Sequence, residues 1–351
     1  MRSIRYDGRL MHIRTIDLFS GIGGIRLGFE RACQKASITH ECVLASDISK
    51  NACKVYVSRF GDKVNPLCDI TKIDPNDIPD FDVMLGGFPC QAFSSAGHRL
   101  GFEDATRGTL FFNIAKILAA KKPKAFLLEN VRGLITHKKG QTMATIIGVL
   151  SDLGYRTSYK ILNSKDFGVA QNRPRVYILG VRAEQIEGEW AKWPKPLSLD
   201  KPMTLADVLE SGPLDQKFWM SKSYWATLVR HKERQSAKGH GFGYLIKTPT
   251  DIASTIMCGG MGKERNLLID KNPATPLREE ANDQWIRFMT PTEWEKLQGY
   301  PFGWTSSVPD SSRMRLLGNS VTVPVIEAVS ETLLKELIHP TAPAESIFGK
   351  D

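Results

Sequence analysis

The tripeptide Pro89-Cys90-Gln91 places a thiol at the end of an apolar, strand-like run (81–88) and at the start of a Gly- and Ser-rich segment (91–97). A structural cysteine is usually buried and inert, whereas a nucleophilic one is partly exposed in a setting that favours the thiolate. The transition from strand to loop permits the second role. We therefore predict that Cys90 is a catalytic nucleophile, with packing at the strand end as the alternative.

A glycine-rich turn, Asp17-Leu-Phe-Ser-Gly21-Ile-Gly23-Gly24, follows the first predicted strand and precedes a predicted helix. Glycines at such a turn allow a ligand to approach the backbone closely. Arg26 stands where a dinucleotide fingerprint has its third glycine, which argues against pyrophosphate binding and against NAD. A tight turn without a ligand is the alternative.

Two acidic residues accompany this turn. Asp47 ends the second predicted strand, the usual place for a contact with ribose hydroxyls, and Asp69 lies before the next strand. A glycine turn with two acids and no phosphate clamp suits the adenosyl group of S-adenosylmethionine better than a dinucleotide.

The elements that position these residues alternate between strands and helices over about 180 residues, in the order typical of βαβ units. The predicted strands are 15–19, 41–46, 81–85, 125–129, 157–163 and 175–181. The predicted helices between them are 26–35, 50–60, 110–121 and 141–153. This pattern predicts an α/β fold with a doubly wound, mostly parallel sheet.

The composition changes after Arg182, and residues 183–285 show weak periodicity and many Trp, Pro and Lys residues. This segment is predicted to be a second, smaller domain with much irregular structure. A helix is predicted after Thr290-Pro291, with Thr as N-cap and Pro at the first helical position. The last predicted helix is 323–337, and the tail 339–351 is expected to fray.

Charge and composition narrow the class of protein. The 351 residues carry a formal net charge of +9, which favours a polyanionic partner. The six cysteines show no close pairing, so neither a disulfide framework nor a metal site is predicted, and a reducing cytosol fits best. The sequence has no apolar run long enough to span a membrane and no signal-peptide segment. Met11, just before the first predicted strand, is an alternative start.

Five segments, in this order, resemble the motifs of DNA (cytosine-5)-methyltransferases, and the resemblance spans roughly residues 13–335. They are Asp17-Leu-Phe-Ser-Gly-Ile-Gly-Gly, Gly87-Phe-Pro-Cys-Gln-Ala-Phe-Ser, Glu129-Asn130-Val131, Gln171-Asn-Arg173-Pro-Arg175 and Gly318-Asn319-Ser320-Val321. Arg107-Gly-Thr-Leu-Phe-Phe and Gln298-Gly-Tyr-Pro301 fit the same pattern. The resemblance implies the S-adenosylmethionine-dependent methyltransferase fold with a smaller recognition domain.

The resemblance also implies roles for particular residues. Cys90 is the expected nucleophile, Glu129 contacts or protonates N3 of cytosine, and Arg173 and Arg175 hold the flipped base and the adjacent phosphate. The implied cofactor residues are Phe19, Gly21, Gly23, Asp47, Ile48, Asp69, Ile70, Asn319 and Val321. The family commonly has Glu in place of Asp47 and Gly in place of Cys68.

The chemistry explains these residue types. A thiolate that adds to C6 of cytosine makes C5 nucleophilic enough to attack a methyl sulfonium. A positive charge from Arg173 or Arg175 would raise the thiolate fraction. Glu129 must be at least partly protonated to donate toward N3, which predicts a raised pKa. The base must leave the duplex stack, and residues 91–106 are long enough to close over it.

By this reading, residues 1–185 form the catalytic and cofactor-binding domain, 186–307 the DNA-recognition domain, and 308–351 return to the catalytic domain. Two stretches, 230–244 and 253–266, are similar to the recognition region of methyltransferases that act on CCGG, and more weakly to those that act on CCNGG-type sites. Methylation of the inner cytosine of CCGG is therefore expected. The predicted DNA-binding residues are Gln91, Ser94, Thr255, Lys263, Arg265 and Asn266.

Three alternative functions remain at this level: a tRNA cytosine-5 methyltransferase, a non-catalytic DNA-binding protein on the same fold, and a dinucleotide oxidoreductase, which the missing third glycine disfavours. A plain solvated basic face is the alternative for the recognition stretches. Double-stranded DNA is the expected partner, and a restriction endonuclease acting on the same site is a further one that needs no direct contact. We expect a bacterial cytoplasmic, nucleoid-associated monomer.

Overall fold

The computed structural model describes residues 5–6, 9–61, 64, 66–89, 110–185, 188, 190–198, 200–241, 243–274 and 276–338. The chain divides into two compact units. Unit 1 comprises Met1–Leu162, Pro174–Lys195 and Val325–Asp351, and unit 2 comprises Asn163–Arg173 and Pro196–Pro324. Unit 2 thus includes residues 163–173 and 308–324, which lie outside the predicted recognition domain. The roles assigned to the predicted domains stay predictions.

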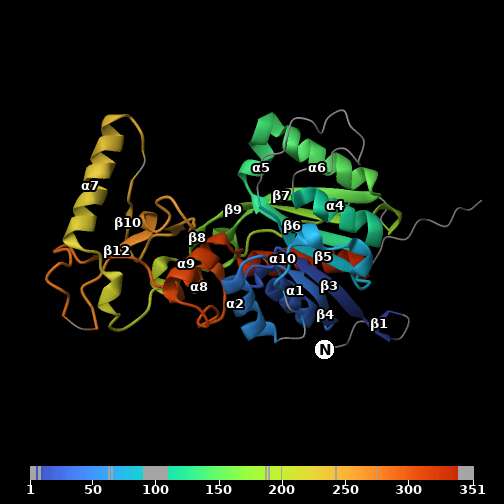
Figure 1. The fold of residues 1–351 in the computed structure, drawn as a ribbon, viewed down its shortest axis with the longest axis horizontal. Coiled ribbons are helices and arrows are strands. Elements are labelled where there is room, and N and C mark those ends of the chain that lie inside the picture. Colours follow the sequence, from blue (N-terminus) through green and yellow to red (C-terminus); the bar gives the residue numbers. More distant parts are fainter. Residues whose placement is uncertain are drawn as a thin grey trace, which may run out of the picture. The chain divides into compact units, whose positions relative to one another are not determined.

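Six of the described strands form the central sheet, in the order β4-β3-β5-β6-β9-β7 (Figure 1). Their bounds are β3 His12–Leu18, β4 Thr39–Ser46, β5 Val83–Gly87, β6 Ala125–Val131, β7 Tyr155–Asn163 and β9 Pro174–Arg182. Strand β3 pairs in parallel with β4 and β5, β5 pairs in parallel with β6, and β9 runs antiparallel to β6. The predicted α/β fold with a mostly parallel sheet is confirmed, with strand ends shifted by one to three residues.

Helices cover both faces of this sheet because successive strand residues point to opposite sides. On one face, helices α4 (Leu110–Lys121) and α6 (Gln141–Asp152) bury their apolar stripes against Met84 and Leu128, in the main core cluster. On the other face, Ile25 of helix α1 (Gly24–Lys35) lies 3.3 Å from the Cβ position of Gly87.

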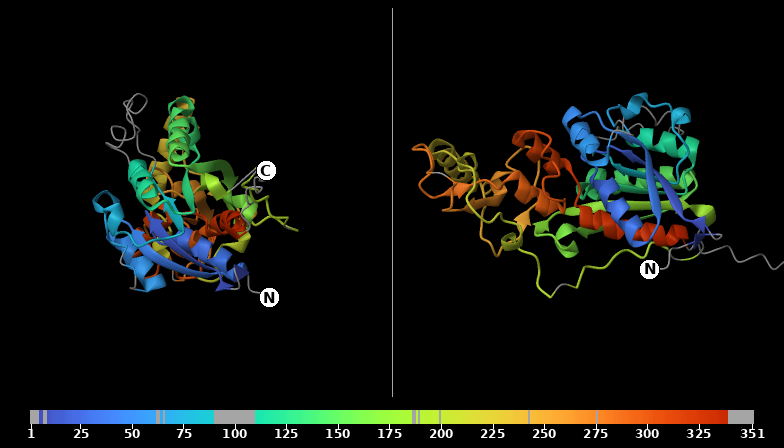
Figure 2. Two further views of the ribbon diagram at one scale, coloured as in Figure 1. Left: turned by 90° about the vertical axis from the view of Figure 1, so that its right-hand side faces the viewer. Right: turned by 90° about the horizontal axis from the view of Figure 1, so that it is seen from below.

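The last helix of the chain, α10 (Val323–Ile338), packs against α1 (Figure 2, red and blue). A Cβ added to Gly28 would lie 2.6 Å from Ile326, so only glycine permits this close approach. Lys35 forms an ion pair with Glu331 at 2.9 Å beside it. The C-terminal helix from Val325 onward is therefore part of unit 1.

The remaining elements of unit 1 are short or follow from local signals. Ser49 caps α2 (Lys50–Phe60) by accepting a hydrogen bond from the Ala52 amide. The other bounds are β1 Arg5–Tyr6, β2 Arg9–Leu10, α5 Gly133–Thr136 and the 3-10 helices Ile70–Lys72, Pro75–Asp77, His137–Gly140 and Ala183–Gln185.

Unit 2 is built from short strands and three helices within the described residues. The helices are α7 Lys222–Ala237, α8 Pro291–Gln298 and α9 Asp310–Asn319. The strands are β8 Gln171–Asn172, β10 Ile246–Lys247, β11 Ala253–Ser254, β12 Leu267–Ile269 and β13 Ile286–Arg287. The 3-10 helices are Ser164–Phe167, Leu205–Asp207, Gln216–Phe218 and Glu264–Asn266.

The predicted helix after Thr290 is confirmed, since Thr290 and Glu293 form a reciprocal capping box at the start of α8. The helix α7, by contrast, was missed in a segment expected to be irregular. Leu228 is its one fully buried residue, so its apolar periodicity is faint in the sequence. None of the described helices has the length and apolarity needed to cross a membrane.

Candidate active site

The predicted nucleophile Cys90, together with Gln91 and Ser94, lies outside the described residues. The structure positions the strand that leads to it. Phe88 is 3% exposed, and its ring packs against Phe111 of α4 at a centroid distance of 5.8 Å. Its main-chain carbonyl accepts a hydrogen bond of 2.8 Å from the side-chain NH₂ group of Asn130. The chain is therefore anchored two residues before Cys90.

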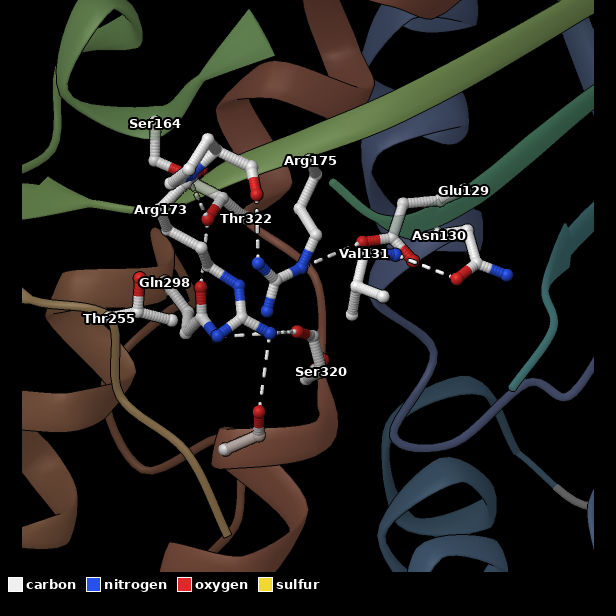
Figure 3. A network of polar contacts seen from close by, with 12 residues as sticks. Glu129, Asn130, Val131, Ser164, Arg173, Arg175, Thr255, Gln298, Ser320 and Thr322 are labelled. Carbon is white, nitrogen blue, oxygen red and sulfur yellow. Dashed lines mark hydrogen bonds and ion pairs between the residues drawn. The ribbon is translucent and has the colours of Figure 1, made fainter. Parts of the chain in front are cut away.

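Glu129 and Arg175 lie together at the ends of two neighbouring strands (Figure 3). Glu129 pairs in register with Gly87 of β5, and a Cβ added to Gly87 would lie 3.7 Å from Oε2 of Glu129. Arg175 Nε lies 3.3 Å from Oε1 of Glu129, and the two side chains are 13% and 11% exposed. Two of the residues predicted to be catalytic thus form an ion pair beside the strand that precedes Cys90.

Asn130 stabilises this arrangement, although no role was predicted for it from the sequence. It is 2% exposed, and its amide oxygen accepts a hydrogen bond of 2.8 Å from the Val131 amide. Its NH₂ group bonds the carbonyl of Phe88. Its place in the segment Glu129-Asn130-Val131 was the available signal. The side chain links the strand carrying Glu129 to the segment that leads to Cys90.

The glycine turn adopts backbone conformations that favour glycine or strain other residues. Gly21 and Gly23 have φ angles of +53° and +81°, and Phe19 has a φ of +54°. A Cβ on Gly23 would lie 2.2 Å from the ring of Phe60. A non-glycine residue held at positive φ is uncommon and often belongs to a ligand site.

Asp47 closes this turn from the end of the adjacent strand β4. Its carboxylate accepts hydrogen bonds from the Gly21 amide at 2.8 Å and from the Ser49 amide at 2.7 Å. Ile48 beside it is 75% exposed. An adenosyl group needs acceptors for ribose hydroxyls and an apolar surface for the base, and these two residues provide both kinds. The residues of unit 1 therefore fit an adenosyl cofactor.

The segment that carries Asp69 is tied to Asp47 through the backbone. The Asp47 amide donates to Pro66 O at 2.7 Å, and the Cys68 amide donates to Asp47 O at 3.2 Å. Hydrogen bonds from the amide and hydroxyl of Thr71 lower the pKa of Asp69. The Ile70 side chain is 5% exposed in the core, which leaves its main chain for any cofactor contact.

Asp17 is a buried acid that the sequence analysis quoted only as part of a motif. It is fully buried at the end of β3. Burial raises the pKa of Asp17 to about 8, although the Arg26 charge and the Tyr56 hydroxyl oppose this shift. The carboxyl group beneath the glycine turn is therefore mostly protonated near neutral pH.

In unit 2, the Arg173 side chain forms hydrogen bonds with three main-chain carbonyl groups (Figure 3). Its guanidinium donates to Ile256 O at 2.7 Å, to Gly318 O at 3.2 Å and to Ser320 O, and the residue is 2% exposed. These bonds position the segment that contains Asn319. These contacts give Arg173 a structural role. Its predicted contact with cytosine or phosphate stays a prediction.

The other predicted cofactor residues of unit 2 follow that segment. Asn319 is exposed, and its amide oxygen accepts a hydrogen bond from the Cys258 thiol. Val321 is 6% exposed.

The model of the family described as C-5 cytosine-specific DNA methylase matches residues 13–335. The chain belongs to this family. It is 45% identical to the type II methyltransferase M.HpaII of Haemophilus parainfluenzae over 331 residues, covering 92% of this chain and 89% of that protein. It is 41% identical to the type II methyltransferase M1.ScrFI of Lactococcus lactis subsp. cremoris, covering 92% of this chain and 78% of that protein.

Solved structures agree on the fold. The S. pombe Dnmt2 methyltransferase superposes with a TM-score of 0.69 at 23% identity, covering 93% of this chain and 99% of that one. The Entamoeba histolytica methyltransferase EhMeth gives a TM-score of 0.66 at 20% identity, with the same coverage. The chain is a DNA (cytosine-5) methyltransferase, and S-adenosylmethionine is its methyl donor.

The DNA-binding residues predicted for this methyltransferase differ in how they are held. Lys263 is exposed and Arg265 is half-buried. Thr255 donates its hydroxyl to Asn172 O at 2.7 Å. Asn266 is 0% exposed, and its side-chain amide bonds the main-chain N–H and C=O of Ser254 at 2.7 and 3.2 Å, so its predicted contact with DNA stays a prediction. Both ends of this amide are used inside the protein, so Asn266 orders the segment that precedes it.

Proposed function

We propose that this methyltransferase modifies C5 of the inner cytosine of CCGG in double-stranded DNA, through a flipped base and a covalent bond between Cys90 Sγ and C6. The observation that carries the proposal is the Glu129–Arg175 pair at the end of β6, beside the β5 strand that leads to Cys90. The resemblance of residues 230–244 and 253–266 to CCGG-specific recognition regions supports the site.

The proposed reaction begins when the Cys90 thiolate adds to C6 and the ring electrons move toward N3 and C5. Glu129 shares a proton with N3 and so limits the negative charge that develops on the ring. The Arg175 guanidinium adds positive charge next to this position, which also favours the thiolate. Arg173 is proposed to assist in holding the flipped base and the adjacent phosphate.

S-adenosylmethionine, when bound, supplies an electrophilic methyl group for C5. Phe19, Gly21, Gly23, Asp47, Ile48, Asp69 and the Ile70 main chain are proposed to hold it, with Asn319 and Val321. Loss of the C5 proton then restores the ring and expels the Cys90 thiolate, so the enzyme is regenerated. Flipping the base out of the duplex costs a few kcal/mol, which binding to the protein must supply.

We infer that the biological role is protection of DNA against an endonuclease that cuts the same site. One active site per chain is sufficient for this role, so we propose a monomer that needs no direct contact with the endonuclease. DNA as substrate places the proposed activity in the bacterial cytoplasm, at the nucleoid.

Bisulfite sequencing of genomic DNA from a methylation-free bacterial host that expresses the gene tests the proposal. Protected cytosines confined to the inner position of CCGG are expected. Protection at another short motif would replace CCGG, and soluble protein without any protected cytosine would contradict DNA methylation.

The covalent step has its own test. A duplex with 5-fluorocytosine at the target should form a stable adduct in the presence of S-adenosylmethionine, because fluorine cannot leave as a proton does. Cys90→Ser should form no adduct and show no methylation. Adduct formation by Cys90→Ser would exclude this residue as the nucleophile.

A further inference from the structure

A pocket of about 340 Å³ lies in unit 2, lined by residues of helix α7 and of the segment 243–265. It is lined by His231, Gln235, Gly243, Met257, Met261 and Arg265. Of these, the sequence analysis named only Arg265 as a candidate DNA contact.

The pocket continues one face of α7 beyond the small core of unit 2. Tyr224, Leu228, His231 and Gln235 recur at helical spacing, so they share that face. Tyr224 donates to Glu264 at 2.7 Å, and Leu228 is buried in the core cluster against which Met261 packs. His231 and Gln235 follow on the same face, where the core ends. The hydrogen bond of Tyr224 and the packing of Leu228 therefore fix the position of this side of the pocket.

Two buried nitrogen atoms distinguish this pocket. Within the part of the chain that the structure describes, neither Arg265 Nε nor His231 Nδ1 has a hydrogen-bond partner, although both atoms are shielded from solvent. A buried donor without a partner is destabilising, and such groups in native proteins call for an explanation such as a ligand. Arg265 Nε is a donor, so the occupant should offer it a hydrogen-bond acceptor, whereas His231 Nδ1 donates or accepts according to its tautomer.

The shape and chemistry favour a base edge over a phosphate. Met257 and Met261 provide polarizable apolar walls beside these polar groups, so a base edge would be bound next to a surface that excludes water. The guanidinium fork of Arg265 matches the adjacent acceptors O6 and N7 of guanine, the commonest specific contact of arginine with DNA. We propose that His231, Gln235 and Arg265 form the pocket that reads one guanine of the recognition site. This inference rests on the proposed DNA recognition by unit 2.

The test measures methylation of the mapped recognition duplex and of copies in which each guanine in turn is replaced by 7-deazaguanine. That base lacks the N7 acceptor but keeps Watson–Crick pairing. We expect kcat/KM of the wild-type enzyme to fall ~10- to 100-fold at one guanine. On the unmodified duplex, kcat/KM of Arg265→Ala should be lower than that of wild type by a similar factor. On the modified duplex, kcat/KM of this variant should fall little further, because the two changes remove the same contact. Independent, multiplicative losses would overturn the proposal.

Arg265→Lys separates base reading from charge. Lysine keeps the positive charge but not the planar fork, so it should remain as impaired as alanine. Full rescue by lysine, with equal losses on all sequences, would indicate a phosphate contact and contradict the proposal. His231→Ala should reduce specificity for guanine at the same position, so bisulfite maps should show methylation at sites with another base there. Glu233→Ala, at an exposed position of α7, is the matched control and should leave the map unchanged.

The outcomes keep the two proposals apart. Methylation at a site other than CCGG would refute the proposed site but leave the guanine test intact on the mapped site. Wild-type methylation with no sensitivity to 7-deazaguanine at any position would refute the pocket while the proposed function stands. Thermal melting of each variant checks folding, and a folded His231→Ala carries the test if Arg265→Ala does not fold.

Discussion

Arg175 Nε lies 3.3 Å from Glu129 Oε1 across two antiparallel strands, and each side chain is less than one-seventh exposed. An arginine at this distance stabilises the charged carboxylate. Glu129 and Arg175 therefore form one electrostatic unit next to the strand that leads to Cys90. The raised pKa predicted for Glu129 stays a prediction for the complex with DNA.

The first prediction concerns this pair. Glu129→Gln preserves size but removes the exchangeable proton and the charge, so kcat should fall ~10²- to 10⁴-fold with a smaller change in KM for DNA. The double variant Glu129→Gln/Arg175→Ala should be little worse than the more damaging single variant, because the two residues act together. Single-turnover methyl transfer measures both effects. Glu129→Gln activity within threefold of wild type, about 0.7 kcal/mol, would falsify the catalytic role.

The second prediction concerns Asp17, whose pKa rises from 3.8 to about 8 through burial. Between these values the folded chain holds a proton that the unfolded chain releases, so the resulting stability is lost as the pH rises through 8. Asp17→Asn removes this dependence. The difference in free energy of unfolding between Asp17→Asn and wild type should shift in favour of the variant by about 1.4 kcal/mol from pH ~7 to pH ~9. Urea unfolding at both pH values measures it, and a constant difference would contradict the assignment.

The third prediction concerns Arg287, a buried cation of unit 2. Its guanidinium bonds both carboxylate oxygens of Glu293, at 2.9 and 3.0 Å, and Asp270 at 2.7 Å, while its side chain is 2% exposed. Arg287→Ala leaves buried carboxylates without their counter-charge and should destabilise the protein by about 3–5 kcal/mol. Arg278→Ala, at an exposed position, is the control and should change stability by less than about 0.5 kcal/mol. Equal denaturation midpoints for the two variants would argue against the network.

The fourth prediction contrasts two glycines. Gly23→Ala forces a side chain into a positive φ and against Phe60, and should cost about 1–3 kcal/mol and raise KM for S-adenosylmethionine. Gly148→Ala in helix α6 meets open space and should stabilise the protein by about 0.4–1 kcal/mol. Thermal melting and methyl-donor titration separate the two. An unchanged stability of Gly23→Ala would contradict the role of this glycine in the turn. A lower stability of Gly148→Ala would contradict the open space at that position of α6.

Local patterns in the sequence were enough to predict the architecture. Alternating apolar runs and helical periods placed all six strands of the central sheet, and α2 and α4 begin and end at the predicted residues. Thr290-Pro291 marked the start of α8, since capping depends on neighbours only a few residues apart. Spacing after strands also indicated the Gly21 turn and Asp47, which the structure joins by a hydrogen bond.

Other features depend on contacts between distant parts of the chain. Arg173 stands in a short sequence motif, but the partners of its guanidinium lie 83 to 147 residues away along the chain. The hydrogen bonds between the Asn266 side chain and the main chain of Ser254 have no local signature in the sequence. The pairing of His231 with Arg265 in one pocket has no local signature either. Sequence patterns report secondary structure and motif chemistry because these are local, whereas only tertiary packing decides which polar side chains hold the protein together and which remain available for DNA.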